Sequence, residues 1–100
     1  MIMVIRRTQS RAIREVIEEL LKSSGLDQKL KERELIRQWD EVVGVLVSRS
    51  TETIYIRDRK LFVTIRSSVI RNEMMMIREG IRLELNRRIG QVMIDEIIIR

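Results

Sequence analysis

The sequence contains no cysteine, no histidine and no proline, and only three of its 100 residues are aromatic. Without cysteine there is no disulfide, no thiolate zinc site and no cysteine nucleophile. Without histidine, the commonest general base and the imidazole of the usual Ser/His and Cys/His triads are missing too. These absences exclude most enzyme chemistry. They also require a core built from aliphatic residues and methionine.

Other kinds of reactive site are equally hard to find. None of the acidic residues has the spacing of a calcium-binding loop, and no glycine-rich phosphate loop is present. Ser67 and Ser68 stand where a helix needs a cap, and neither has a candidate base. We therefore expect no catalytic residue, no metal and no cofactor, and a protein that is not an enzyme.

The beginning of the chain does not read as a targeting segment. A short apolar run precedes the first arginines, whereas a secretory signal places its charges before a longer apolar stretch. No run approaches the roughly 18 apolar residues of a membrane span. We expect a cytoplasmic protein that does not contact membranes. Its length suits a single domain over residues 1–100, with residues 1–8 as a flexible basic N-terminus.

Positive charge is in excess, with 20 basic and 15 acidic residues and a formal net charge of +5. Sixteen of the basic residues are arginine, whose planar guanidinium group fits phosphate and stacks on flat rings. Such a balance is typical of nucleic-acid contact. It also lies within the range that keeps a small domain in solution, so both interpretations stay open.

The spacing of apolar residues predicts the order helix, helix, strand, strand, helix, strand. The expected elements are helices over 10–24 and 27–43, strands over 53–57 and 61–66, a helix over 68–88 and a strand over 92–100. Asp27 is the expected N-cap of the second helix, a further turn over 45–48 is left open, and Gly80 leaves open a break in the long helix. We expect an α+β fold of order α-α-β-β-α-β, a three-stranded sheet with helices on one face.

Alternation along the expected hairpin assigns its two faces. The side chains expected to face the helices are Ile54, Ile56, Leu61, Val63 and Ile65. Tyr55, Arg57, Phe62 and Arg66 point the other way, and two rings beside two cations resemble a stacking platform for single-stranded nucleic acid. Alternatively, Tyr55 and Phe62 are a cross-strand pair that stabilises the hairpin. A third interpretation is that a partner or a second copy covers them.

Basic residues also gather in three places outside this face or next to it. The clusters are Arg71, Arg78 and Arg82 on one side of the long helix, Arg57, Arg59 and Lys60 around the hairpin turn, and Arg6, Arg7, Arg11 and Arg14 near the start. Our candidate nucleic-acid-binding residues are Arg57, Arg59, Lys60, Arg66, Arg71, Arg78, Arg82, Tyr55 and Phe62. The alternative is that each row of charges is simply a solvated face.

Two apolar features are expected to be structural. Trp39 lies on the apolar side of the second helix and is expected to anchor the core, with its indole N–H bonded to one acceptor. Met74 belongs to the apolar stripe of the long helix, whose other members are Ile70, Ile77, Ile81 and Leu85. Met75 and Met76 fall outside that stripe.

Four stretches carry a resemblance to a known family: Trp39-Asp40-Glu41-Val42-Val43-Gly44, Leu61-Phe62-Val63 in the expected hairpin, Ser67-Ser68-Val69, and Asn72-Glu73-Met74. In these residues the chain resembles the DciA family of bacterial proteins, and the resemblance extends from about Thr8 to Arg100. It is similar in particular to short versions of the domain found in Bacteroidetes-type bacteria, without the extended tail that many members carry.

The resemblance implies a KH-like fold of type II and a role in loading or operating a DnaB-type replicative helicase, with affinity for single-stranded DNA. No GxxG loop is present, so a KH-like grip on the nucleic-acid backbone is not expected. Two alternatives remain: a general RNA-binding module, and a protein-interaction domain whose positive charge meets an acidic partner. The oligomeric state and the choice between DNA and RNA stay open.

Overall fold

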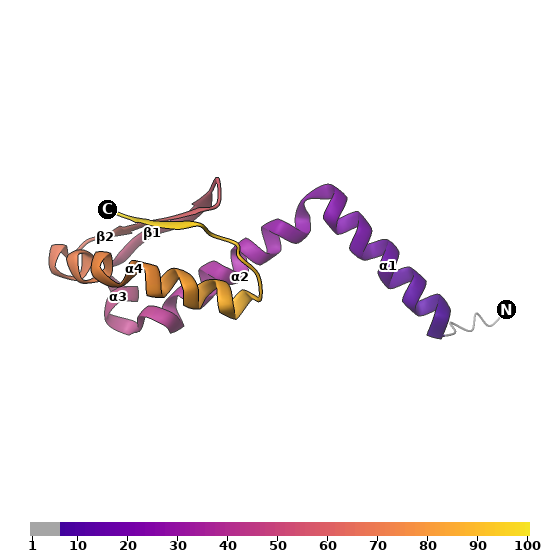
Figure 1. The fold of residues 1–100 in the computed structure, drawn as a ribbon, viewed down its shortest axis with the longest axis horizontal. Coiled ribbons are helices and arrows are strands. Elements are labelled where there is room, and N and C mark those ends of the chain that lie inside the picture. Colours follow the sequence, from indigo (N-terminus) through magenta and orange to yellow (C-terminus); the bar gives the residue numbers. More distant parts are fainter. Residues whose placement is uncertain (1–6) are drawn as a thin grey trace. The chain divides into compact units, whose positions relative to one another are not determined.

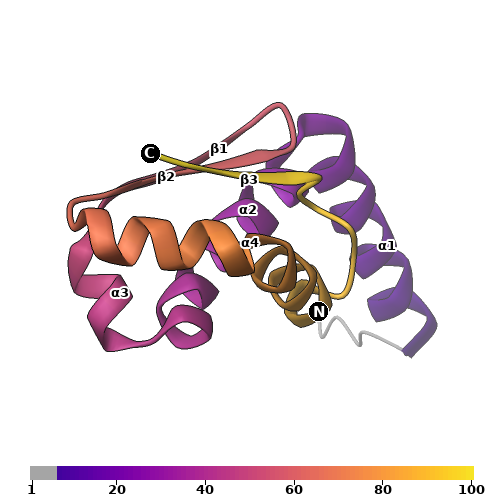
Figure 2. The same cartoon turned by 60° about the vertical axis from the view of Figure 1, so that its left-hand side comes forward.

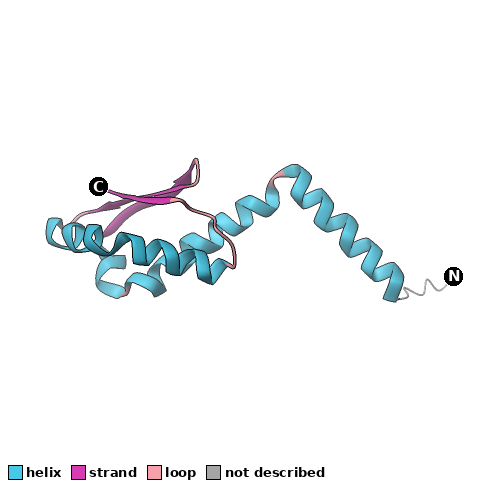
Figure 3. Ribbon diagram, viewed as in Figure 1, coloured by secondary structure: helices cyan, strands magenta, loops and turns pink. Residues whose placement is uncertain are grey.

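The computed structural model describes residues 7–100, with side chains from residue 12 onward. Its elements, drawn in Figures 1 and 3, are α1 (Arg7–Ser24), α2 (Leu26–Val43), α3 (Val45–Ser50), β1 (Thr51–Arg57), β2 (Lys60–Ile65), α4 (Ser68–Ile89) and β3 (Glu96–Ile99). The chain divides into two compact units, residues 1–30 and residues 31–100. Of the expected flexible stretch 1–8, residues 1–6 lie outside the described part, and residues 7 and 8 begin α1.

The α+β class and the order of elements are confirmed, with the optional turn after Gly44 present as the separate helix α3. The long helix α4 runs through Gly80 without a break. Its N-cap is Ser67, whose hydroxyl accepts a hydrogen bond from the backbone N–H of Ile70. The expectation for Asp27 was wrong, because α2 begins one residue earlier and Asp27 lies inside its first turn.

The sheet has the strand order β1-β2-β3, with β1 antiparallel and β3 parallel to the central strand β2. The turn between β1 and β2 consists of Asp58 and Arg59, both with positive φ (51° and 61°), as expected for a two-residue hairpin turn that follows the strand twist. The last strand is shorter than expected and begins at Glu96, because the residues before it form a loop held by the end of α4.

Helices cover one face of the sheet. In Figures 1 and 2, α4, α3 and the part of α2 after residue 30 all lie on the same side of the three strands. The fully buried side chains between these layers are Leu35, Trp39, Leu61, Val63, Ile65, Leu85, Met93, Ile94 and Ile97. The inward set predicted from alternation is therefore confirmed on β2, while Ile54 and Ile56 on the edge strand β1 are half-buried.

Trp39 is 1% exposed, which confirms it as a core residue. Its indole N–H donates a hydrogen bond of 3.1 Å to Oγ1 of Thr51, and that hydroxyl donates one of 2.8 Å to the carbonyl of Val47. This chain of bonds joins α2, α3 and the start of β1. A buried indole N–H needs such a partner, since an unmade hydrogen bond in the core costs free energy.

One expectation about buried residues was wrong. Ile77 is 52% exposed because the buried positions of α4, Met74, Ile81 and Leu85, leave it at the margin of the stripe. Four apolar residues of α1 (Ile13, Val16, Ile17 and Leu20), and Leu30 in α2, are also exposed. A helical period shows that one side of a helix is apolar, but it does not show what covers that side.

Asn86, near the end of α4, connects that helix to the loop before β3. The residue is buried, its Nδ2 donates to the carbonyl of Ile94 at 2.9 Å, and its Oδ1 accepts from the backbone N–H groups of Met93 and Ile94 at 3.0 and 3.1 Å. Gly90 allows the chain to turn from α4 into this loop, since it ends α4 in the left-handed conformation with φ 85°. The carboxamide of Asn86 thus supplies hydrogen-bond partners for the backbone of Met93 and Ile94.

Replacing Asn86 by alanine should lower the free energy of unfolding by about 2–4 kcal/mol, because two buried N–H groups and one carbonyl lose their partners. Urea denaturation followed by Trp39 fluorescence measures the change. Asn72→Ala, on an exposed position of the same helix, is the matched control and should unfold near the original midpoint. Equal stabilities for the two variants would contradict this role of Asn86.

Candidate nucleic-acid interface

The face of the sheet opposite α3 and α4 carries the two aromatic residues singled out in the sequence. Tyr55 pairs with Phe62 across β1 and β2. Their ring centroids lie 4.9 Å apart and their planes differ by 8°, so the rings are stacked. The arrangement has the geometry of a cross-strand pair that stabilises a hairpin. Tyr55 stands on an edge strand and keeps 43% of its surface exposed.

Arg100 completes this face, and sequence reasoning missed it. Its guanidinium carbon lies 5.2 Å from the centroid of Phe62, and its Nη2 donates a hydrogen bond of 3.0 Å to the hydroxyl of Tyr55. The backbone of Arg100 continues the pairing with β2. Its N–H donates to the carbonyl of Val63, and its carbonyl accepts from the N–H of Ile65. Alternation along the last strand was the available signal, but it could be used only once the parallel register with β2 was known.

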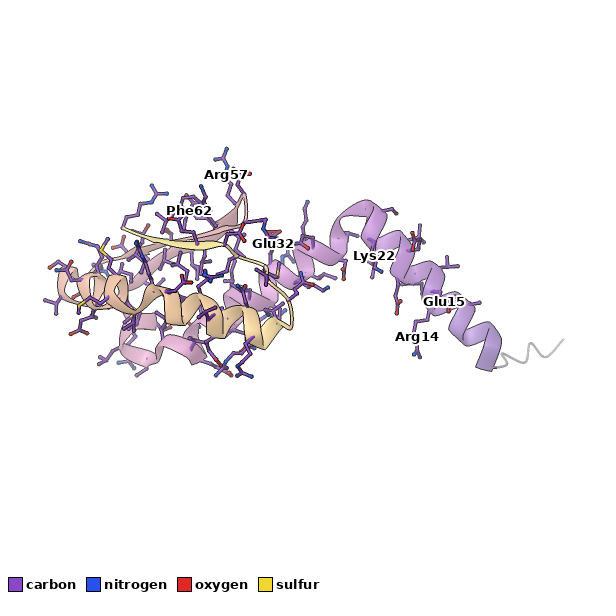
Figure 4. All side chains as sticks on the ribbon, in the orientation of Figure 1. Arg14, Glu15, Lys22, Glu32, Arg57 and Phe62 are labelled. Carbon is purple, nitrogen blue, oxygen red and sulfur yellow. The ribbon has the colours of Figure 1, made fainter. Side chains whose placement is uncertain are left out.

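Two further cations lie at the turn end of the same face. Arg57 and Lys60 are cross-strand partners in the register of β1 and β2, and both are exposed. In Figure 4 the side chains of Arg57 and Phe62 point away from the helices. The ion pair of Arg57 with Asp58 is 4.0 Å long and lies between two strongly exposed side chains, where water and salt screen the attraction.

We call Tyr55, Phe62, Arg57, Lys60 and Arg100 the sheet-face site. Four of these five were candidates from the sequence. Arg66 lies beyond the other end of β2, where its Nε is 3.3 Å from a carboxylate oxygen of Glu52 and its Nη2 donates to the carbonyl of Arg49. It remains exposed, but it already has an acidic partner.

Arg59, in contrast to the residues of the sheet-face site, stabilises the fold. Its guanidinium group makes two hydrogen bonds of 2.9 Å to the carboxylate of Asp95 and a third, of 2.8 Å, to the carbonyl of Val92. Hydrogen bonding to Arg59 lowers the pKa of Asp95. Bidentate pairs of this kind are strong and directional. Arg59 therefore connects the hairpin turn to the loop that leads into β3.

Two of the three arginines expected on one side of the long helix also make hydrogen bonds within the fold. Nη2 of Arg71 donates to the carbonyl of Ile65 at 2.7 Å, at the end of β2, and its Nε is buried without a partner. Arg82 is paired with Glu79 and donates to the carbonyl of Ile94, and its side chain is 17% exposed. Arg78 is the exposed one of the three.

A family model described as Dna[CI] antecedent, DciA, matches residues 12–99. The chain belongs to the DciA family. This family is associated with loading of the DnaB helicase in replication, so the chain has, at this coarse level, the role of a replication accessory protein with a helicase partner. It is a family of helicase accessory proteins and not one of known enzymes. No curated protein is significantly similar to the chain in sequence.

Features that two other kinds of site would need are absent from the described residues of this DciA-family chain. Within residues 7–100, no group of three or more acidic side chains is placed so that it could hold a metal ion. No helix in the same range has both the length and the apolar character that crossing a bilayer requires. The sheet-face site, with its stacked rings and neighbouring guanidinium group, is the candidate that the geometry favours.

Replacing Arg71 by alanine should lower the free energy of unfolding by about 2 kcal/mol, since the end of β2 would lose its hydrogen bonds from a charged group. Arg78→Ala removes the same charge from an exposed position of the same helix. Its stability should stay within about 0.5 kcal/mol of the original, as is usual for exposed positions. Thermal unfolding of the two variants compares them directly, and a destabilised Arg78→Ala would show that the assignment is wrong.

From the pKa of Glu84 we can predict how the stability of the domain changes in acid. Hydrogen bonds from Arg87 and Arg88 lower the pKa of Glu84 from 4.5 to about 2. A carboxylate with a lowered pKa in the folded state stabilises the fold above its ordinary pKa, and this contribution disappears as the pH falls toward the lowered value. Stability should therefore decrease between pH 4.5 and pH 2.

In Glu84→Gln this part of the pH dependence should be missing, so that the variant is less stable than the original chain at about pH 6 and loses less between pH 4.5 and pH 2. Urea denaturation at a series of pH values gives the two curves. Glu73→Gln, an exposed glutamate of α4, removes the same charge and serves as the control. Parallel curves for the original chain and Glu84→Gln would contradict the assignment.

Proposed function

We propose that this protein binds single-stranded DNA at the sheet-face site while it serves a DnaB-type replicative helicase. The observation that carries the proposal is the stacked pair of Tyr55 and Phe62 on the open face of the sheet, with the guanidinium group of Arg100 beside it. Membership of the DciA family supports the helicase as partner in general terms.

Unpaired bases stack on aromatic side chains, and this interaction contributes about 1–3 kcal/mol per base with little dependence on sequence. The edge position of Tyr55 and its 43% exposure support this mode of binding. Arg100 adds a planar cation that can remain on the ring or bind a phosphate. Sequence-independent contact of this kind suits a protein that works on any strand a helicase encloses.

Phosphates need cations beyond the rings, and Arg57 with Lys60 provides them at the turn end of the face. In the described part of the chain neither side chain is held in a bidentate pair, in contrast to Arg59. A backbone that crosses the stacked rings toward the turn would therefore meet two hydrated cations. This mode does not need the GxxG loop that KH domains use.

Single strands are favoured over duplexes because the rings can stack only on bases that are free of their neighbours. RNA offers the same bases, so an RNA-binding role rests on the same stacked pair and is separated from the DNA role by measurement. The third candidate, a domain that binds only proteins, predicts no nucleic-acid binding at the sheet-face site.

The double variant Tyr55→Val, Phe62→Val should weaken binding to labelled single-stranded DNA about 10- to 100-fold, because removing one base stack costs about 1–3 kcal/mol. Valine is chosen since a β-branched residue keeps the strand while it removes the rings. Fluorescence polarisation with single-stranded DNA, single-stranded RNA and duplex DNA measures the affinities. Trp39 emission in the same samples reports whether the domain is folded.

Two controls accompany that experiment: Met76→Val for the ring variant, and Arg78→Gln for a variant of the two cations. Met76→Val removes an exposed apolar side chain of α4 and should leave the affinity unchanged. Arg57→Gln with Lys60→Gln should make the salt dependence shallower, by roughly 0.7 in the logarithmic slope for each phosphate that the protein no longer neutralises. Arg78→Gln should not change it. Full affinity in the ring variant would contradict the proposal, and a slope that depends on Arg78 alone would move the phosphate-binding surface to α4.

A further inference from the structure

The register of the three strands arranges the residues around the sheet-face site in three rows. Residues paired between neighbouring strands direct their side chains to the same face of a sheet. The backbone bonds of Arg100 to Val63 and Ile65 place it opposite Thr64. From the hairpin turn onward, the rows are Arg57, Lys60 and Glu96, then Tyr55, Phe62 and Ile98, then Thr53, Thr64 and Arg100.

The charges of these rows are distributed unevenly over the strands. Arg57 and Lys60 place two cations over the β1–β2 hairpin at its turn end. Arg100 directly follows β3, but its guanidinium group lies over the ring of Phe62 and donates to the hydroxyl of Tyr55, so its charge also lies over the hairpin. The hairpin side of the face is therefore cationic.

Strand β3 contributes a carboxylate and an aliphatic side chain to the same face, those of Glu96 and Ile98. Glu96 is exposed, and in the described part of the chain it takes part in no ion pair, whereas its neighbour Asp95 is held by Arg59. In the register it stands directly across from Lys60. A carboxylate in this position repels a phosphate group that approaches over β3.

We propose that single-stranded DNA follows the β1–β2 hairpin, from Arg57 and Lys60 over the stacked rings to Arg100, and that Glu96 keeps its phosphates away from β3. This inference rests on the proposed function, since it specifies the course of the strand over the same site. Glu96 is then a specificity-determining residue that acts by repulsion. Binding proteins use repulsive groups as well as attractive ones to select what they bind.

The dimensions of the hairpin suit this course. Lys60 and Thr64 belong to the first and third rows and are four residues apart, which is about 13 Å along a strand. The rings of Tyr55 and Phe62 lie in the row between them. Sheets that bind RNA through aromatic residues stack about two or three bases. Bases on the rings and phosphates at both ends therefore fit the same interval.

The alternative course crosses the strands along the middle row, from Tyr55 over Phe62 to Ile98. Phosphates on this course would pass over β3, where the face offers the carboxylate of Glu96 and no cation from the strand itself. An aliphatic side chain also lacks the flat ring on which a base stacks. The distribution of charge and of rings thus favours the course along the hairpin.

Neutralising Glu96 should strengthen binding. Glu96→Gln should bind labelled single-stranded DNA about two- to fivefold more tightly at low salt, because the repulsion between two unit charges at close range in water is of this order. Fluorescence polarisation measures the affinities. Glu73→Gln removes the same charge from an exposed position of α4 and should bind like the original chain. Equal affinities for Glu96→Gln and the original chain overturn the role of Glu96.

Two further substitutions distinguish the two courses. Thr53→Lys adds a cation at the far end of the hairpin course, so the logarithmic salt slope should steepen by about 0.7 for one additional phosphate, while the uncharged control Thr53→Val should keep the original slope. Ile98→Thr keeps a β-branched residue on β3 and should leave the affinity unchanged. An unchanged slope in Thr53→Lys together with weaker binding by Ile98→Thr overturns the proposal in favour of the course across the strands.

The ring variant Tyr55→Val, Phe62→Val separates this inference from the proposed function. If the ring variant loses affinity while Glu96→Gln and Thr53→Lys bind like the original chain, DNA binds at the sheet-face site by another course, and only this inference fails. If the ring variant binds as tightly as the original chain, the binding site lies elsewhere and both proposals fail. Trp39 emission in each sample reports whether the variant is folded.

Discussion

The parallel pairing of β3 with the central strand β2 is the interaction on which the C-terminal unit depends. It brings Ile97 and Ile99 into the core and places Arg100 beside the stacked rings. A parallel strand can return only through a crossover, which α4 provides, and its loop then has few backbone partners. Asn86 and Arg59 satisfy that loop from opposite sides, one from the helix and one from the hairpin turn. The candidate interface and the core therefore both depend on the pairing of β3 with β2.

Many of the arginines that make this chain basic are engaged within the fold. Arg59, Arg71 and Arg82 each bond a backbone carbonyl, and Arg88 links α4 to α2 through Gln38 and Glu41. Arginine suits these positions because one planar group offers several donors in fixed directions. Net charge is for that reason a weak guide to function in this chain. What separates a binding cation from a structural one is whether its donors already have partners.

The sequence was sufficient to predict the element order, the hairpin and the side of the sheet on which Tyr55 and Phe62 lie, because the alternation of strands and the spacing of helices are local properties. It was not sufficient for Arg100 or Asn86, since their roles depend on a parallel register between strands separated by α4. The bonds of Arg71 to the end of β2 were missed for a related reason. Helical spacing predicts a shared side of α4, whereas the direction of a guanidinium group depends on the carbonyls that the tertiary fold brings near it.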